Sequence, residues 1–138
     1  MNLGRVILGG LVAGLLMNVG EFVLNGIILH DAMVAWGTKH NLPPEPKATF
    51  FVTAIGLTFV LGIITVWVYA LMRPRLGPGP KTAIVAGLVM WFGIYLYCGI
   101  INGLILKIPT NDLAIGIAWG LAEYVIAAIA GAWLYKEA

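Results

Sequence analysis

Four long apolar stretches, separated by short polar segments, dominate the pattern of hydrophobic and polar positions along this chain of 138 residues. They cover 6–29, 48–72, 82–106 and 113–135. Each is long enough to cross about 30 Å of hydrocarbon as an α-helix that rises about 1.5 Å per residue. The pattern therefore predicts an all-α fold, a four-helix transmembrane bundle in the lipid bilayer.

The connections between the stretches are short, which favours an up-down-up-down order of antiparallel neighbours. Segment 73–81 is rich in proline and glycine, so we expect it to end the second helix sharply and to start the third. In the longest connection, 31–36 is expected to form a short interfacial helix, and the proline-rich 41–46 an extended segment. Little lies outside the apolar stretches, so we expect residues 1–138 to form one integral membrane domain.

The sequence also repeats itself weakly. Segment 12–17 matches 85–90, and the match continues at the glycines of positions 20 and 93 and over 26–28 and 99–101. The first and third helices enter the membrane from the same side, so this pattern indicates a parallel two-helix repeat. The alternative interpretation is chance agreement among apolar residues.

Composition narrows the functional classes. The chain is 61% hydrophobic and 10% charged, whereas a soluble domain is about 25% charged. It contains no serine and a single cysteine, Cys98, which excludes Ser-His-Asp hydrolysis and an intrachain disulfide. The net charge of +2 includes no basic run, so a nucleic-acid partner is not expected. No complete catalytic set is present, and we expect that the protein is not an enzyme.

Charge also predicts an orientation. The basic residues are divided between the two ends of the expected bundle: Arg5, Arg73, Arg75, Lys81 and Lys136 at one end, and Lys39, Lys47 and Lys107 at the other. Positive charge marks the cytoplasmic side. We therefore expect both termini in the cytoplasm, with a bacterial inner membrane as the location.

Glu21, inside the first apolar stretch, is the main candidate for function. A carboxylate in hydrocarbon costs several kcal/mol unless it is neutralised or hydrogen-bonded, and no Lys or Arg lies in any of the four stretches to pair with it. Asn18 and Asn25 share its helix face at helical spacing. Glu123 lies near the middle of the fourth stretch. The pattern therefore predicts a buried titratable site.

The two carboxyls are expected to lie within about 10 Å of each other in depth if the first and fourth helices are neighbours. At least one of them should then hold a proton at neutral pH. Asn102 and Tyr95 of the third helix would complete the cluster. One interpretation is a protonation switch or a cation-binding pocket; the other is a neutral carboxylic acid that joins helices by hydrogen bonds.

Other patterns carry less information. His30, Asp31 and His40 lack a further ligand at defined spacing, so we expect a solvated loop and no metal site. Some of the tryptophans and tyrosines are candidates to line an aromatic cavity for an organic cation, although belt or core positions are the simpler interpretation. Small-residue pairs such as Gly10 and Gly14 predict close helix packing. Whether those seams lie inside one bundle or between protomers is left open.

The segments 21–26, 35–37 and 91–93, together with the region of Asn102, resemble a family of small bacterial four-span membrane proteins, a domain of unknown function. That resemblance implies the four-helix topology and no activity. Glu21 alone resembles the membrane-embedded glutamate of small multidrug-resistance transporters. This likeness implies a carboxyl that protons and cationic substrates share. The present chain differs in its larger outer loop and in its second carboxyl, Glu123.

Taken together, the sequence predicts a small integral membrane protein for proton-linked transport, or for binding a small hydrophobic or cationic ligand. Glu21 would titrate, Asn18 and Asn25 would orient it, and Glu123 would be a second carboxyl. The alternative is a non-catalytic accessory subunit of a larger membrane complex. We expect either a homo-oligomer or such a complex as the assembled form, and no pattern identifies a cofactor.

Overall fold

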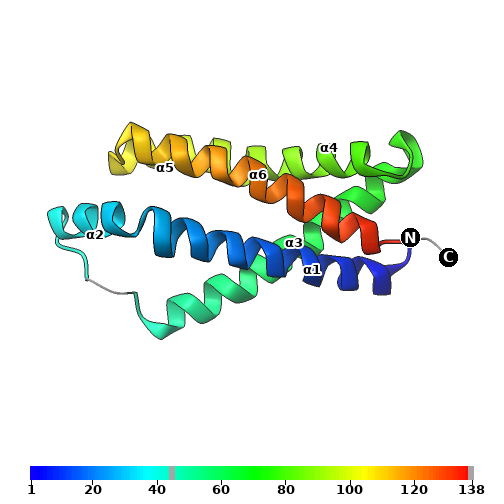
Figure 1. Ribbon diagram of the computed structural model, residues 1–138, viewed down its shortest axis with the longest axis horizontal. Coiled ribbons are helices and arrows are strands. Elements are labelled where there is room, and N and C mark those ends of the chain that lie inside the picture. The colour runs from blue at the N-terminus through cyan, green and yellow to red at the C-terminus, as the bar shows by residue number, and fades with distance from the viewer. Residues whose placement is uncertain (44–45, 137–138) are drawn as a thin grey trace.

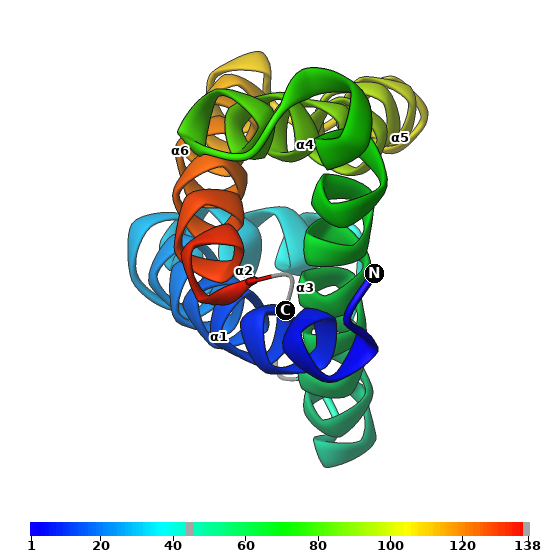
Figure 2. The ribbon, with the colours of Figure 1, turned by 90° about the vertical axis from the view of Figure 1, so that its right-hand side faces the viewer.

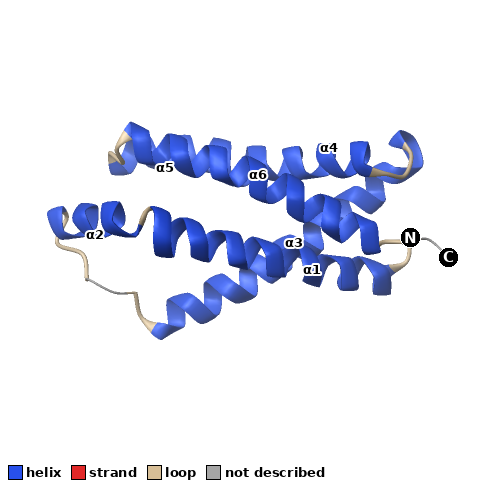
Figure 3. Cartoon of the chain, viewed as in Figure 1, coloured by secondary structure: helices blue, strands red, loops and turns tan. Residues whose placement is uncertain are grey.

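The apolar stretches form long helices that run back and forth along one axis (Figure 1). The computed structural model describes residues 1–43 and 46–136. In chain order the elements are α1 (Leu3–Val23), the π-helical segment η1 (Leu24–Ile28), α2 (His30–Lys39), α3 (Ala48–Leu76), α4 (Pro80–Trp91), the π-helical segment η2 (Phe92–Tyr97), α5 (Cys98–Leu106) and α6 (Thr110–Leu134). The part of the chain that is described contains no strand (Figure 3).

Four continuous helical spans are long and apolar enough to cross a membrane: Leu3–Ile28, Ala48–Leu76, Pro80–Leu106 and Thr110–Leu134. The first joins α1 to η1, and the third joins α4, η2 and α5. The prediction of an all-α bundle with four membrane-spanning helices is therefore confirmed, and the chain is an integral membrane protein. Each span begins or ends within a few residues of the predicted stretch.

Seen along its axis, the bundle has α1, α3, α4 and α6 at its four corners (Figure 2). Helix α1 packs against α3 and α6, and α4 packs against the same two helices. Each half of the chain thus forms its own antiparallel pair, α1 with α3 and α4 with α6 (Figure 1). This pairing is the one that a two-helix repeat would produce, and the duplication itself stays a prediction.

The connection between α3 and α4 differs from the prediction. Segment 73–81 does not break the helix from its first residue, because α3 continues through Pro74 to Leu76. Pro74 removes one backbone hydrogen bond from this last turn, but the helix continues for two more residues. The helix ends instead at Gly77, whose φ of 83° suits glycine and whose N–H donates to Arg73 O at 2.9 Å. Pro80 then opens α4, the position at which proline is favoured.

The long connection contains the predicted short helix. Helix α2 begins at His30 and ends at Lys39, so it extends beyond the expected 31–36. Of the segment expected to be extended, Pro44 and Glu45 lie outside the described residues.

Glycines set the distance between α1 and α3. A Cβ at Gly62 would overlap the backbone N of Gly14 and the backbone O of Gly10, and would lie 2.6 Å from Gly14 Cα. The two backbones therefore approach as closely as they do only because all three residues lack side chains. This places the seam of Gly10 and Gly14 inside the bundle of one chain, a point that the sequence left open.

The core occupies the half of the bundle that carries the termini. Its buried residues include Val6, Met17, Val66, Tyr69 and Tyr124. In the opposite half the first turns of α3, residues 48–57, are exposed apart from the half-buried Ala54, and α3 diverges there from α1 (Figure 1). The bundle is therefore closed at one end and open at the other.

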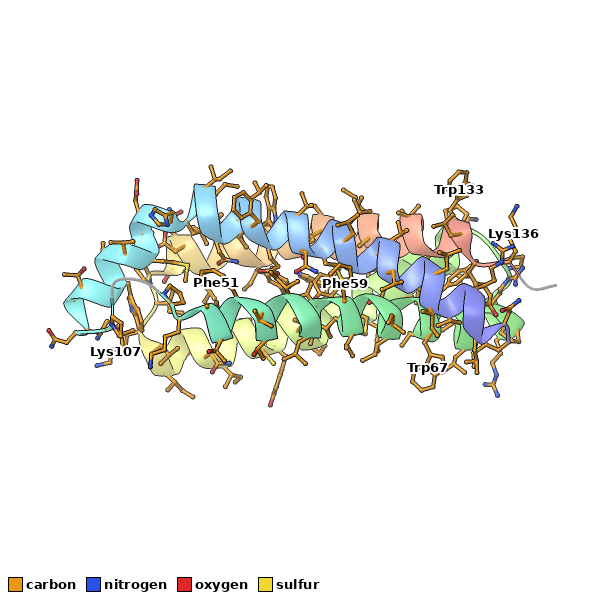
Figure 4. The ribbon with its side chains drawn as sticks, turned by 90° about the horizontal axis from the view of Figure 1, so that it is seen from below. Phe51, Phe59, Trp67, Lys107, Trp133 and Lys136 are labelled. Atoms are coloured by element: carbon orange, nitrogen blue, oxygen red, sulfur yellow. The ribbon has the colours of Figure 1, made fainter. Side chains whose placement is uncertain are left out.

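Basic side chains lie at both ends of the bundle, and outward-pointing tryptophans lie near one of them. Lys107 and Lys136 lie at opposite ends of the long axis (Figure 4). Trp67 and Trp133 project outward near the Lys136 end, with 43% and 81% of their surfaces exposed. Tryptophan in such a position is typical of the membrane–water interface. Which end faces the cytoplasm stays a prediction.

Candidate functional site

The first part of the site is a π-helical turn that starts after Glu21. Leu29 N donates to Leu24 O, five residues back, at 2.8 Å. The side chain of Asn25, inside η1, donates to the carboxylate Oε2 of Glu21 at 2.8 Å and to the backbone O of Glu21 at 3.1 Å. One extra residue in a turn rotates the following side chains by about 100° relative to an ideal helix. Such turns are frequent at functional sites.

The second part comes from η2, the π-helical segment of the third span. Tyr95 lies within it, and its hydroxyl donates to the other carboxyl oxygen of Glu21, Oε1. The Tyr95 ring can lie there because residue 120 of α6 is glycine: a Cβ at Gly120 would overlap the ring. The ring also contacts Tyr124 edge-on, with centroids 5.6 Å apart. Both oxygens of Glu21 thus accept a hydrogen bond, each from a different span.

The third part is Glu123, which α6 carries into the bundle. Its side chain is 8% exposed. It lies against Gly20, because a Cβ at Gly20 would lie 2.5 Å from Glu123 Oε2. One turn earlier, Trp119 Nε1 donates to Gly20 O at 3.1 Å and joins α6 to α1. The carboxyls of Glu123 and Glu21 are close enough to interact, but neither oxygen of Glu123 has a hydrogen-bond partner among the described residues.

A cavity of about 530 Å³ opens from Glu21 toward the α2 end of the bundle. Its lining comes from α1, η1, α2, η2, α5, α6 and the connection before α6: Glu21, Leu24, Asn25, Leu29, Ala32, Met33, Trp36, Ile94, Tyr95, Cys98, Gly99, Asn102, Leu106, Ile108, Pro109, Asp112, Leu113, Gly116 and Ile117. None of these residues is Lys or Arg, and most are apolar. The volume lies within the range of small-molecule sites, about 300–1,000 Å³.

The structure brings together most of the residues that the sequence singled out. Glu21, Asn25, Tyr95 and Asn102 line the cavity, and Glu123 lies behind Glu21. Asn102 donates to Cys98 O at 2.8 Å, one turn back on its own helix. Asn18 lies elsewhere: its side chain donates to Gly14 O at 2.9 Å and to Ile55 O of α3 at 3.4 Å, so it joins α1 to α3 and does not contact the carboxylate.

Three features of the site were missed by sequence reasoning. Met33 and Trp36 of α2 line the cavity, although the pattern indicated only an interfacial helix. Asp112 supplies a second carboxyl to the lining. Glycines at 20 and 120 make room for Glu123 and Tyr95. Periodicity along one helix carries no signal for contacts that depend on which neighbours fold against it.

The outer histidines do not assemble into a metal site among the described residues, where no group of three or more His, Cys, Asp or Glu side chains could hold an ion. His40 instead stacks near Trp36, with ring centroids 4.4 Å apart. In the third span, Trp91 Nε1 donates to Ile117 O at 2.9 Å. This bond ties the span to α6 beside the cavity.

Cys98 provides a direct test of whether water enters the cavity. It is exposed, lines the cavity and is the only cysteine of the chain. We expect a charged methanethiosulfonate reagent, which does not cross membranes, to label it in reconstituted protein, because thiol modification requires the hydrated thiolate. A control combines Cys98→Ala with Ala86→Cys, which moves the thiol to a fully buried position of α4. Labelling of Cys98 by membrane-permeant reagents alone would contradict a water-filled cavity.

The site is therefore a cavity of about 530 Å³ that is lined by a hydrogen-bonded carboxylate. A second carboxyl lies behind it and accepts no hydrogen bond from any described residue. Since fold alone does not establish activity, the function proposed below rests on this geometry. Comparison of the chain with protein-family models, with curated proteins and with solved structures finds no match.

Proposed function

We propose that the protein binds a small organic cation in this cavity and exchanges it for a proton at Glu21, as a small proton-linked transporter or binding protein. The observation that carries the proposal is that Glu21, a residue of a membrane-spanning helix, lines the cavity. Intramembrane carboxyls with this access are functional by default. Tyr95 and Asn25 each donate a hydrogen bond to the Glu21 carboxylate and fix its orientation in the cavity wall.

The lining favours a cation with an apolar body. Two carboxyls, Glu21 and Asp112, are the ionisable acids of the lining, and no basic side chain offsets them. Leucine, isoleucine and methionine form about half of the remaining wall. Trp36 adds an aromatic ring, whose face attracts cations. An anion or a strongly hydrated sugar would find few partners here.

Exchange with protons follows from the chemistry of a single carboxylate. The negative charge of the Glu21 carboxylate is neutralised either by a bound proton or by a bound cation. The two states exclude each other, so cation binding is expected to weaken as the pH falls. Competition of two occupants for one carboxyl links their binding equilibria.

The experiment is a calorimetric titration of the protein in lipid nanodiscs with tetraphenylphosphonium, a lipophilic organic cation. Support requires saturable binding that weakens from mildly alkaline to mildly acidic pH, and slower labelling of Cys98 in the bound state. Binding that does not saturate, or that is independent of pH, would contradict the proposal. Uptake of the same cation into liposomes with an imposed pH gradient then separates a transporter from a binding protein.

A role as accessory subunit is the second candidate, and the exposed first turns of α3 favour it. Residues Phe50, Phe51 and Val52 are 50–73% exposed, on a helix half that the other described residues leave uncovered. Native mass spectrometry after gentle extraction tests this role. Co-purification with other chains at fixed stoichiometry would support it, whereas a small homo-oligomer would support the autonomous protein.

A further inference from the structure

We infer that Glu123 is the resident proton site of this protein, and that it holds a proton which it exchanges with Glu21. This proton exchange deepens the proposed function, and its role in transport or binding rests on that function. It begins from an asymmetry between two carboxyls that lie close together. Glu21 accepts a hydrogen bond on each oxygen, whereas Glu123 accepts none from any described residue.

Burial is the second observation. Both oxygens of Glu123 are shielded from the surroundings, and the side chain is 8% exposed. A buried carboxylate without a donor or a cation is strongly destabilised. A neutral carboxylic acid in the same place needs no counter-charge. The groups that face it are the Glu21 carboxyl from α1, the Tyr95 hydroxyl from η2, and Trp119 and Tyr124 of α6. None of them is basic, and the indole N–H of Trp119 donates to Gly20 O.

The position behind Glu21 is the third observation. Glu123 does not line the cavity, whereas Glu21 does. A proton from Glu123 therefore reaches the cavity through Glu21. In the exchange an O–H bond of Glu123 breaks and an O–H bond forms on a carboxylate oxygen of Glu21, so the negative charge moves to Glu123 and the pair keeps one proton. Arrival of a cation at Glu21 would favour the return of that proton.

Gly20 makes the arrangement possible. A Cβ at this position would lie 2.5 Å from Oε2 and 2.7 Å from Cδ of Glu123. Its backbone O is also occupied by the indole of Trp119. Gly20 thus supplies the space for the Glu123 carboxyl, and its backbone O accepts the indole N–H of the nearby Trp119.

Infrared spectroscopy tests the inference without any ligand. In nanodiscs at neutral pH, the wild type should show the C=O stretch of a protonated carboxylic acid. Glu123→Gln should remove this band, whereas Glu21→Gln should keep it. Asp112→Asn, a change of an acid in the cavity lining away from the pair, should also keep it. A wild type without the band, or a band that survives in Glu123→Gln, would overturn the inference.

A second variant covers the case in which Glu123→Gln does not fold. Glu123→Asp keeps the acid but withdraws it by one methylene, so the band should remain and shift in frequency. An unchanged frequency would assign the band to another residue and overturn the inference. The two proposals also fail separately: an intact band without tetraphenylphosphonium binding contradicts the proposed function alone, and binding without the band contradicts this inference alone.

Discussion

Replacing Glu21 with glutamine is expected to weaken tetraphenylphosphonium binding by about tenfold or more and to remove its dependence on pH. The charge that pairs with the cation is lost, and hydrogen bonds or ion pairs to a charged group are worth about 1.5–3 kcal/mol. In the proposed exchange a proton and the cation compete for Glu21, so wild-type binding weakens as the pH falls. Glutamine does not titrate, so its residual binding should be equal at mildly acidic and mildly alkaline pH. Calorimetry in nanodiscs measures both effects.

Asp112→Asn is the matched control, because Asp112 also contributes a carboxyl to the lining but lies at the start of α6. It should retain the pH dependence and lose less affinity, since a charge near the helix end is better screened. The side-chain oxygen of glutamine at 21 can still accept from Tyr95, so the fold should persist. Wild-type pH behaviour in Glu21→Gln would remove Glu21 from the mechanism.

Gly62→Ala should have the largest effect on stability. The added methyl group would overlap backbone atoms of Gly10 and Gly14, and backbone cannot move aside as a flexible side chain can. Overpacking of this kind costs about 1–3 kcal/mol. Helix α1 carries Glu21, and α3 crosses α1 at Gly62. Separation of the two helices should therefore also reduce ligand binding. The measurement is the midpoint of unfolding, followed by circular dichroism during titration with a denaturing detergent.

The control for that change is on the same helix. A Cβ at Gly56 would meet nothing within 4 Å. Gly56→Ala should therefore leave stability unchanged or raise it by about 0.5–1 kcal/mol, the usual gain from replacing glycine in a helix interior. Equal destabilisation by the two changes would mean that loss of glycine itself, and not contact between α1 and α3, determines the result.

Much of the fold was predictable because it depends on quantities that are local in the sequence. Apolar length decides whether a segment can span a membrane, and short connections decide the antiparallel order. The close packing at Gly10 and Gly14 was also predictable from their spacing, and both residues are buried. The residue at which α3 ends was not predictable. Proline is usually a signal for a helix break, but α3 continues through Pro74 and ends at Gly77.

The candidate site was predictable in part. Glu21 was identifiable from the cost of a carboxylate in hydrocarbon, and Asn25 from its spacing to Glu21. Asn18 satisfies the same spacing rule, yet it hydrogen-bonds to α3. Spacing places a side chain on a helix face, but the neighbouring helix that covers that part of the face determines its partner.

The sequence by itself determined that this is a helical membrane protein with a carboxyl in its first span, because hydrophobic length and the cost of buried charge act residue by residue. Only the tertiary structure decided that Tyr95 and Asn25 donate to the two oxygens of Glu21, and that α2 helps to enclose the cavity. It also decided that Glu123 lies behind Glu21 with no hydrogen-bond partner in the described part of the chain. These contacts join residues far apart in the chain. They depend on where glycines let helices approach and where π-helical turns shift the register, which no single helix specifies on its own.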